Sequence, residues 1–171
     1  MRDGFTLIEM LLALAILAVL SAISFPYIYH AVMGIRLDSL IESASLSVRQ
    51  LIVDARTRSI KEDTVYEFDL SEQSFKSNSG NNHIYLDLPD DFNKHAVLEP
   101  EGLFDPTKTY YFVKGLFVEE DGGTFELVSE DVETTIKPDI TKYTNAIQKS
   151  RVVKITNGLA QVIEYKGEEE D

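Results

Sequence analysis

An apolar run near the N-terminus constrains this chain more than any other feature. Residues 5–25 read FTLIEMLLALAILAVLSAISF, 21 residues of which only Glu9 is ionisable. At about 1.5 Å per residue, a helix of this length spans the roughly 30 Å of a bilayer core. A secretory signal peptide has a cationic leader, a shorter apolar core and a small-residue cleavage site. The leader here is only Met-Arg-Asp-Gly, so we expect residues 5–25 to cross a membrane.

Glu9 is the anomaly in that run. A carboxylate inside an apolar helix costs on the order of 3 kcal/mol at the bilayer centre unless it is paired or protonated. Two interpretations stay open. Glu9 lies one turn from the expected helix start, where the headgroups and the helix dipole favour a negative charge. Alternatively it pairs with a cation within the membrane, such as a free amine created by cutting the chain just before Phe5.

The net charge of −13 is confined to one part of the chain. Residues 1–60 hold five basic and five acidic side chains, so the whole acidic excess lies in residues 61–171. Binding of nucleic acid by this acidic part would work against repulsion and is not expected. Basic spots such as Arg56 and Arg58, just before it, are the exceptions. The chain has no cysteine, which excludes disulfides, thiolate zinc sites and cysteine nucleophiles.

The helical pattern continues beyond the apolar run. One apolar face is predicted to extend an amphipathic helix to about residue 60, and its residues are Leu37, Leu40, Ile41, Ala44, Val48, Leu51, Ile52 and Ala55. A coiled coil is the competing interpretation, but barely three heptads are present. Pro26 removes one backbone hydrogen bond, so it either kinks the helix or ends the transmembrane helix there.

Beyond residue 60 the pattern changes to a period of two, which predicts a β-rich head. We expect strands at 64–70 and 83–88 with an exposed turn between them. Two hairpins are expected as well, one formed by 110–119 and 124–129 and one by 152–155 and 160–165. The second hairpin turns at Asn157-Gly158, which suits a type I′ turn. Three stretches are expected to be irregular, namely 89–108, 130–149 and the C-terminal tail 166–171.

We found no pattern of catalytic or cofactor-binding residues in the head. The sequence contains no nucleotide-binding glycine loop, metalloprotease motif or serine elbow, and His30, His83 and His95 lack metal-ligand spacing. Glu119–Asp121 and Asp90-Asp91 offer oxygen atoms that calcium could use, but they lack the EF-hand spacing, and such acidic loops are more often simply solvated. We therefore expect no enzyme, cofactor or metal site, and we assign Tyr110, Tyr111, Phe112, Phe117 and Phe125 to the sheet core, with one or two left exposed for a neighbouring subunit.

The hexapeptide Gly4-Phe5-Thr6-Leu7-Ile8-Glu9, after a very short leader, resembles the class III signal of type IV pilins and pseudopilins. The resemblance implies that prepilin peptidase cleaves between Gly4 and Phe5 and methylates the new amine of Phe5. It also implies that Glu9 pairs with the Phe5 amine of a neighbouring subunit during filament assembly. Many members of the family have a helix-kinking proline at the place of Pro26.

The resemblance implies an α+β fold, in which a long N-terminal helix packs on an antiparallel β-sheet head. The expected segments are a cleaved leader (1–4), a transmembrane and filament-core helix (5–25), an amphipathic helix (26–60) and an acidic head (61–171). The implied partners are other pilin subunits, prepilin peptidase and the inner-membrane assembly platform. The chain would cross the cytoplasmic membrane once with its head outside, and would then enter an extracytoplasmic filament.

A second resemblance concerns the head. Residues 54–60, the strand at 64–70, the segment 122–127 and the last hairpin resemble the H-type minor pseudopilins of type II secretion and their FimT-like and competence relatives. Those proteins usually have a Gly-Arg pair in the last hairpin, whereas here Gly158 is followed by Leu159. The filament could serve secretion, DNA uptake or a type IV pilus. The alternative is a membrane-tethered ligand-binding module that does not polymerise.

Overall fold

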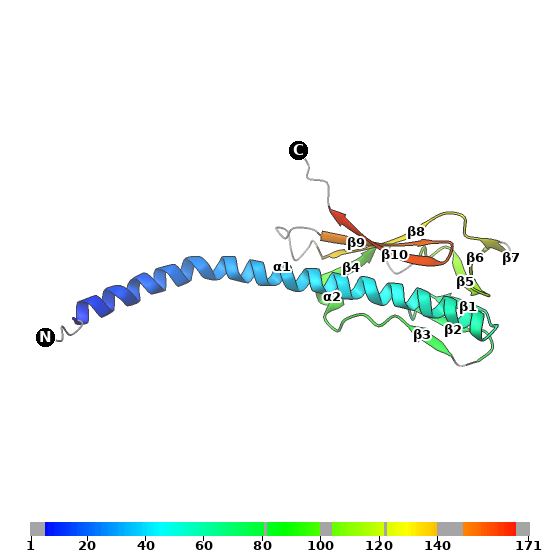
Figure 1. The fold of residues 1–171 in the computed structure, drawn as a ribbon, viewed down its shortest axis with the longest axis horizontal. Coiled ribbons are helices and arrows are strands. Elements are labelled where there is room, and N and C mark those ends of the chain that lie inside the picture. The colour runs from blue at the N-terminus through cyan, green and yellow to red at the C-terminus, as the bar shows by residue number, and fades with distance from the viewer. Residues whose placement is uncertain (1–5, 81, 100–103, 122, 140–148, 167–171) are drawn as a thin grey trace. The chain divides into compact units, whose positions relative to one another are not determined.

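The structure is a computed structural model that describes residues 6–80, 82–99, 104–121, 123–139 and 149–166 (Figure 1). Its fold is α+β, with a long N-terminal helix packed on antiparallel β-structure, as predicted. The elements in chain order are α1 (Leu7–Lys61), β1 (Tyr66–Asp69), β2 (Ser74–Ser77), β3 (His83–Tyr85), α2 (Phe92–His95), β4 (Ala96–Glu99), β5 (Thr109–Val113), β6 (Leu116–Asp121), β7 (Thr124–Leu127), β8 (Val132–Pro138), β9 (Lys149–Thr156) and β10 (Leu159–Lys166).

The chain forms two compact units, residues 1–36 and 37–171, and helix α1 has residues in both. Burial along the helix begins at Leu37, and all eight residues of the predicted apolar face are buried. Ser45 and Ser59 are buried on the same helix, and each hydroxyl donates to a backbone carbonyl three residues earlier, at 2.7 and 2.8 Å. The helix continues through Pro26, so the alternative that Pro26 ends it is wrong, while a kink there remains a prediction.

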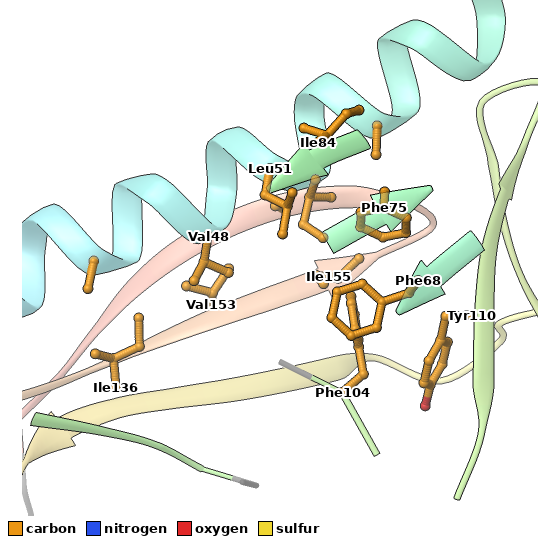
Figure 2. Close-up of a cluster of buried hydrophobic side chains, with 14 of the residues drawn as sticks. Val48, Leu51, Phe68, Phe75, Ile84, Phe104, Tyr110, Ile136, Val153 and Ile155 are labelled. Atoms are coloured by element: carbon orange, nitrogen blue, oxygen red, sulfur yellow. The ribbon is translucent and has the colours of Figure 1, made fainter. Parts of the chain in front are cut away.

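The head contains two antiparallel sheets. Sheet A has the strand order β3-β2-β1-β5-β6-β7, and sheet B has the order β10-β9-β8-β4. Side chains from α1 and from both sheets form one hydrophobic core, in which Val48 and Leu51 of the helix lie near Val153 and Ile155 of β9 (Figure 2). The side chains of the two sheets therefore cover the apolar face of the helix, as its amphipathic pattern requires.

Aromatic side chains fill the centre of this core. Phe68, Phe75 and Phe104 lie together (Figure 2), and ring contacts with centroids 4.4–6.2 Å apart link these three rings and Phe112. Tyr110 stacks on Phe117 at 5.4 Å. Tyr110, Phe112 and Phe117 are buried there as predicted. Tyr111 is also buried, but on the opposite face of sheet A, where Phe125 is 58% exposed. The ring contacts in the core hold β1, β2, β5 and β6 together on the core-facing side of sheet A.

Two strand predictions on sheet A were wrong. The expected turn between residues 71 and 82 contains β2, whose Phe75 is fully buried, because one large side chain anchors an otherwise polar strand. The expected single strand at 110–119 is a hairpin, β5–β6, that turns at Lys114 and Gly115. Both turn residues have positive φ, 51° and 80°, the geometry of a type I′ turn.

The stretches expected to be irregular also contain regular elements. Residues 89–108 contain α2 and β4, and residues 130–149 contain β8, where alternate residues such as Thr134 and Ile136 are buried. Strand β3 ends at Tyr85, before the expected end at residue 88. The final hairpin is confirmed, with Asn157 and Gly158 at φ 52° and 74°. Residues 140–148 and 167–171, which include most of the expected tail, lie outside the described residues.

Candidate functional site

Thr6 and Glu9 cap the start of helix α1. The Thr6 backbone N–H donates to Glu9 Oε2 at 2.9 Å, and the Thr6 hydroxyl donates to the same oxygen at 3.0 Å. In return, the Glu9 N–H donates to Thr6 Oγ1 at 3.3 Å. This reciprocal arrangement is a capping box, which satisfies N–H groups that the first turn of a helix leaves unpaired. The Thr-x-x-Glu spacing before an apolar run is the sequence pattern of such a box.

The cap determines how the Glu9 carboxylate is presented. Both contacts from Thr6 use Oε2, and no contact of Oε1 was found among the described residues. The side chain is exposed, so Oε1 can accept a further donor from another molecule. The helix therefore carries an oriented anion at its N-terminal end, beside the second residue of a chain that would start at Phe5.

The first unit of the chain presents an apolar surface. Within the described residues, α1 is the one helix long and apolar enough to cross a membrane, and none of its most apolar window is buried. Its exposed large apolar residues are Leu7, Ile8, Met10, Leu11, Leu12, Leu14, Ile16, Leu17, Val19, Leu20, Ile23, Phe25, Tyr27, Ile28, Tyr29, Val32 and Ile35. An apolar surface on all sides of a helix is unfavourable in water, so this part of the helix needs lipid or other helices around it.

The comparison with protein families bears on these same residues. The family described as the prokaryotic N-terminal methylation motif matches residues 1–25. The N-terminus is a type IV pilin-like class III signal. The match supports a type IV pilin-like substrate of prepilin peptidase that is anchored in the inner membrane by its apolar helix. No curated protein and no solved structure matches the chain significantly.

Two glutamates of the acidic sequence cluster, Glu119 and Glu120, contact different partners in the head. Within the described part of the chain, no three His, Asp or Glu side chains gather as a metal site would require. Glu119 forms an ion pair with Lys108 at 2.8 Å, and Glu120 accepts the Tyr111 hydroxyl at 2.5 Å. The two glutamates of the acidic sequence cluster are thus engaged in separate contacts on β6.

The end of helix α1 is tied to the β5–β6 turn. Arg56 Nε donates to the Gly115 carbonyl at 3.1 Å, and the Gly115 N–H donates to the buried hydroxyl of Ser59 at 2.9 Å. Lys114 forms an exposed ion pair with Asp63 at 3.2 Å. Arg56, one of the two basic residues considered for nucleic acid, is thus occupied by a structural contact.

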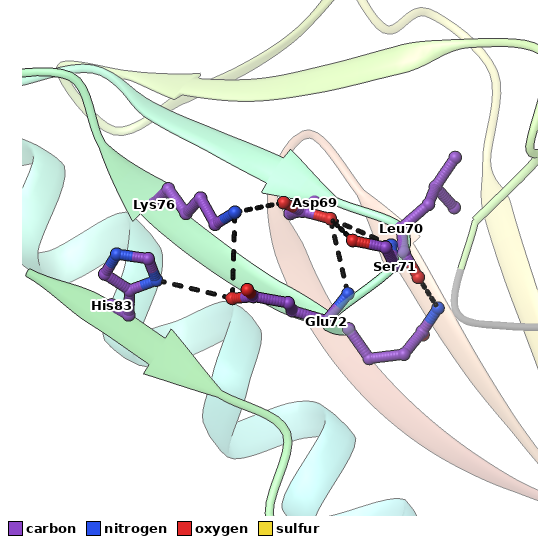
Figure 3. Close-up of polar contacts among 7 residues, drawn as sticks. Asp69, Leu70, Ser71, Glu72, Lys76 and His83 are labelled. Carbon is purple, nitrogen blue, oxygen red and sulfur yellow. Dashed lines mark hydrogen bonds and ion pairs between the residues drawn. The ribbon is translucent and has the colours of Figure 1, made fainter.

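A charged network lies on the outer face of sheet A, over β1, β2 and β3 (Figure 3). Lys76 contacts Asp69 and lies 3.7 Å from Glu72, whose carboxylate is 3.6 Å from His83 Nδ1. The contact with Lys76, followed by the Ser71 hydroxyl, lowers the pKa of Asp69 well below its ordinary value. Because the folded-state pKa is depressed, this pair stabilises the fold above the ordinary carboxyl pKa and loses that effect in strong acid.

The stability of the head is expected to fall at alkaline pH because of three tyrosines. Burial raises the pKa of Tyr66, Tyr110 and Tyr111 above 10.0, and Tyr66 and Tyr111 also donate to Glu62 and Glu120. The folded state then holds these protons where the unfolded state has lost them, so the free energy of unfolding should fall as pH rises above about 10. Tyrosinate absorbance should show three protons released together with unfolding. Their titration at the ordinary pKa in the folded protein would contradict this expectation.

Proposed function

We propose that this chain is a minor pilin or pseudopilin, a structural subunit of a type IV filament that prepilin peptidase processes and that assembles from the membrane. The observation that carries the proposal is the methylation motif at residues 1–25, which includes the first turns of an exposed apolar helix. The pilin-like α+β fold is in accord with it. The role is assembly rather than catalysis.

In the proposed mechanism, the peptidase cleaves between Gly4 and Phe5 and methylates the new amine. The apolar residues of 5–25 hold the subunit in the inner membrane and then form the filament core. Glu9 offers its carboxylate to the Phe5 amine of the adjacent subunit. A buried ion pair offsets its desolvation only when both partners are correctly placed, so the pair would set the register between subunits.

The remaining segments have supporting roles in this proposal. Pro26 would allow the helix to bend between the filament core and the head, because its missing N–H removes one helical hydrogen bond. The amphipathic part of the helix, within residues 26–60, would carry the head (61–171) outside the membrane. The partners would be other pilin subunits and the inner-membrane assembly platform, and no binding of nucleic acid by this head is proposed.

The cleavage step is testable by mass spectrometry of the protein purified from membranes or sheared filaments. We expect a mature chain that starts at N-methylated Phe5. The variant Gly4→Leu should stay uncut, because the residue before the cut would no longer fit the signal. A mature protein that retains Met1 would contradict the proposal.

A membrane-tethered binding module that does not polymerise is the second candidate. It is favoured by the exposed apolar residues on strand β7, Phe125 and Leu127, which offer an apolar surface to a ligand. The two candidates differ in their need for Glu9, since only filament assembly uses its carboxylate. Replacement of Glu9 therefore separates them.

A further inference from the structure

The outer face of sheet A, turned away from the core, has two chemically different halves. The strand register places one residue from each of the six strands side by side in a row across this face. From β3 to β7 the row consists of His83, Lys76, Glu67, Tyr111, Val118 and Leu127. Over β1, β2 and β3 the face carries the charged network, in which Asp69, Lys76 and His83 find partners (Figure 3). Over β5, β6 and β7 the same face is mainly apolar.

The apolar half ends in exposed side chains. Tyr111 and Val118 are almost covered, and the Tyr111 ring meets the Phe125 ring edge to face at 5.0 Å. Leu116, Phe125 and Leu127 are 55%, 58% and 63% exposed. Large apolar side chains gathered at the edge of a sheet mark an interaction surface more often than isolated ones do.

Strand β7 also leaves backbone groups open at this edge. It is the last strand of sheet A, and the Val128 N–H donates to the Phe117 carbonyl at 3.2 Å. Because hydrogen-bonded pairs alternate along an antiparallel ladder, Glu126 and Thr124 bond toward β6. The N–H and C=O groups of Phe125 and Leu127 therefore point outward, where no strand among the described residues pairs with them. The same two residues offer apolar side chains and backbone hydrogen bonds.

The charge of this edge indicates what can pair with it. Strands β6 and β7 contain four acidic residues and no basic one. Glu126 lies directly opposite Glu119, whose carboxylate is paired with Lys108 at 2.8 Å, and no ion pair of Glu126 was found among the described residues. A second copy of β7 would add a further glutamate beside Glu126 and bring together two heads that share the acidic excess, whereas a lysine or arginine opposite Glu126 would be attracted.

We propose that strand β7 binds an extended segment of another protein in which apolar residues alternate with lysine or arginine. The segment would add an antiparallel strand to sheet A, with its apolar residues opposite Phe125 and Leu127 and a basic residue opposite Glu126. Backbone bonds at an open edge supply affinity, and alternate side chains supply specificity. The proposal does not depend on whether the chain assembles into a filament.

The test uses the full chain in non-ionic detergent and two synthetic peptides of equal length, in which isoleucine alternates with lysine or with glutamate. Calorimetry should show binding of the lysine peptide only, weakened by salt. Glu126→Lys should weaken that binding about tenfold and allow the glutamate peptide to bind. Asp87→Lys, an exposed residue after β3 with the same change in charge, should have no effect.

N-methylated peptides test the backbone pairing without altering the protein. Methyl groups on the isoleucine nitrogens, which face β7 in the proposed register, should abolish binding, whereas methyl groups on the lysine nitrogens should leave it intact. Equal binding of the lysine and glutamate peptides, equal effects of the Glu126 and Asp87 variants, or equal effects of the two methylation patterns would overturn the proposal. So would dimerisation of the chain, measured by sedimentation, that Leu127→Pro abolishes, because the occupant would then be a second copy.

Discussion

Replacing Glu9 with leucine is expected to remove the protein from sheared surface filaments, by at least about tenfold relative to wild type, while the protein still accumulates in the membrane. The loss follows because removing one partner of a buried ion pair leaves the other charge uncompensated, at a cost of roughly 3–5 kcal/mol. Insertion into the membrane should become more favourable instead, since the substitution removes a charge whose burial in the bilayer costs on the order of 3 kcal/mol. Immunoblots of the membrane and the sheared fraction measure both effects.

Two matched variants separate the charge of Glu9 from its role in the capping box. Glu9→Gln keeps an oxygen that can accept the Thr6 N–H but has no charge, so it should fail to assemble like the leucine variant. Thr6→Val removes the hydroxyl contacts at 3.0 and 3.3 Å but keeps the carboxylate, so it should assemble. Normal assembly of Glu9→Leu would refute the filament mechanism and favour the tethered binding module.

The helix could be predicted closely because each part of its sequence pattern reflects a single physical requirement. The apolar run from residue 5 needs lipid or other helices, and the face from Leu37 to Ala55 needs a head to cover it. Each of its eight apolar residues is buried. Neither requirement identifies Ser59, whose burial depends on the β5–β6 turn, 56 residues away in the chain.

The sheet could be predicted only in part, because its strands are short and depend on long-range pairing. Strand β2 has a single large apolar residue, Phe75, and its burial is decided by contacts with Phe68 and Phe104. The β5–β6 turn was missed because Lys114-Gly115 is less typical of a type I′ turn than Asn157-Gly158, which was identified. The β7 edge could not have been located without the strand order, since Phe125 was expected in the sheet core.

Gly115→Ala is expected to destabilise the head by about 2–4 kcal/mol, because it introduces two separate penalties. The φ of 80° is unfavourable for a residue with a Cβ, at roughly 1–2 kcal/mol. That Cβ would also lie 2.7 and 2.8 Å from Cδ1 and Cγ1 of Ile60, which the restricted χ1 of isoleucine in a helix makes costly to move. Urea unfolding of the full chain, followed by near-ultraviolet circular dichroism of the tyrosines, measures the change.

Two further variants separate these penalties. Gly123 has a φ of 88° with nothing within 4 Å of an added Cβ, so Gly123→Ala should cost only the backbone part, about 1–2 kcal/mol. Ile60→Ala, at a side chain 57% exposed, should cost little alone and should recover about 1–2 kcal/mol when combined with Gly115→Ala. Additive effects of the two substitutions would mean that Ile60 does not oppose the Cβ. A coupling of the expected size would show that the close approach of Gly115 to the helix, which lets its N–H reach Ser59 and its carbonyl reach Arg56, is what requires glycine at this turn.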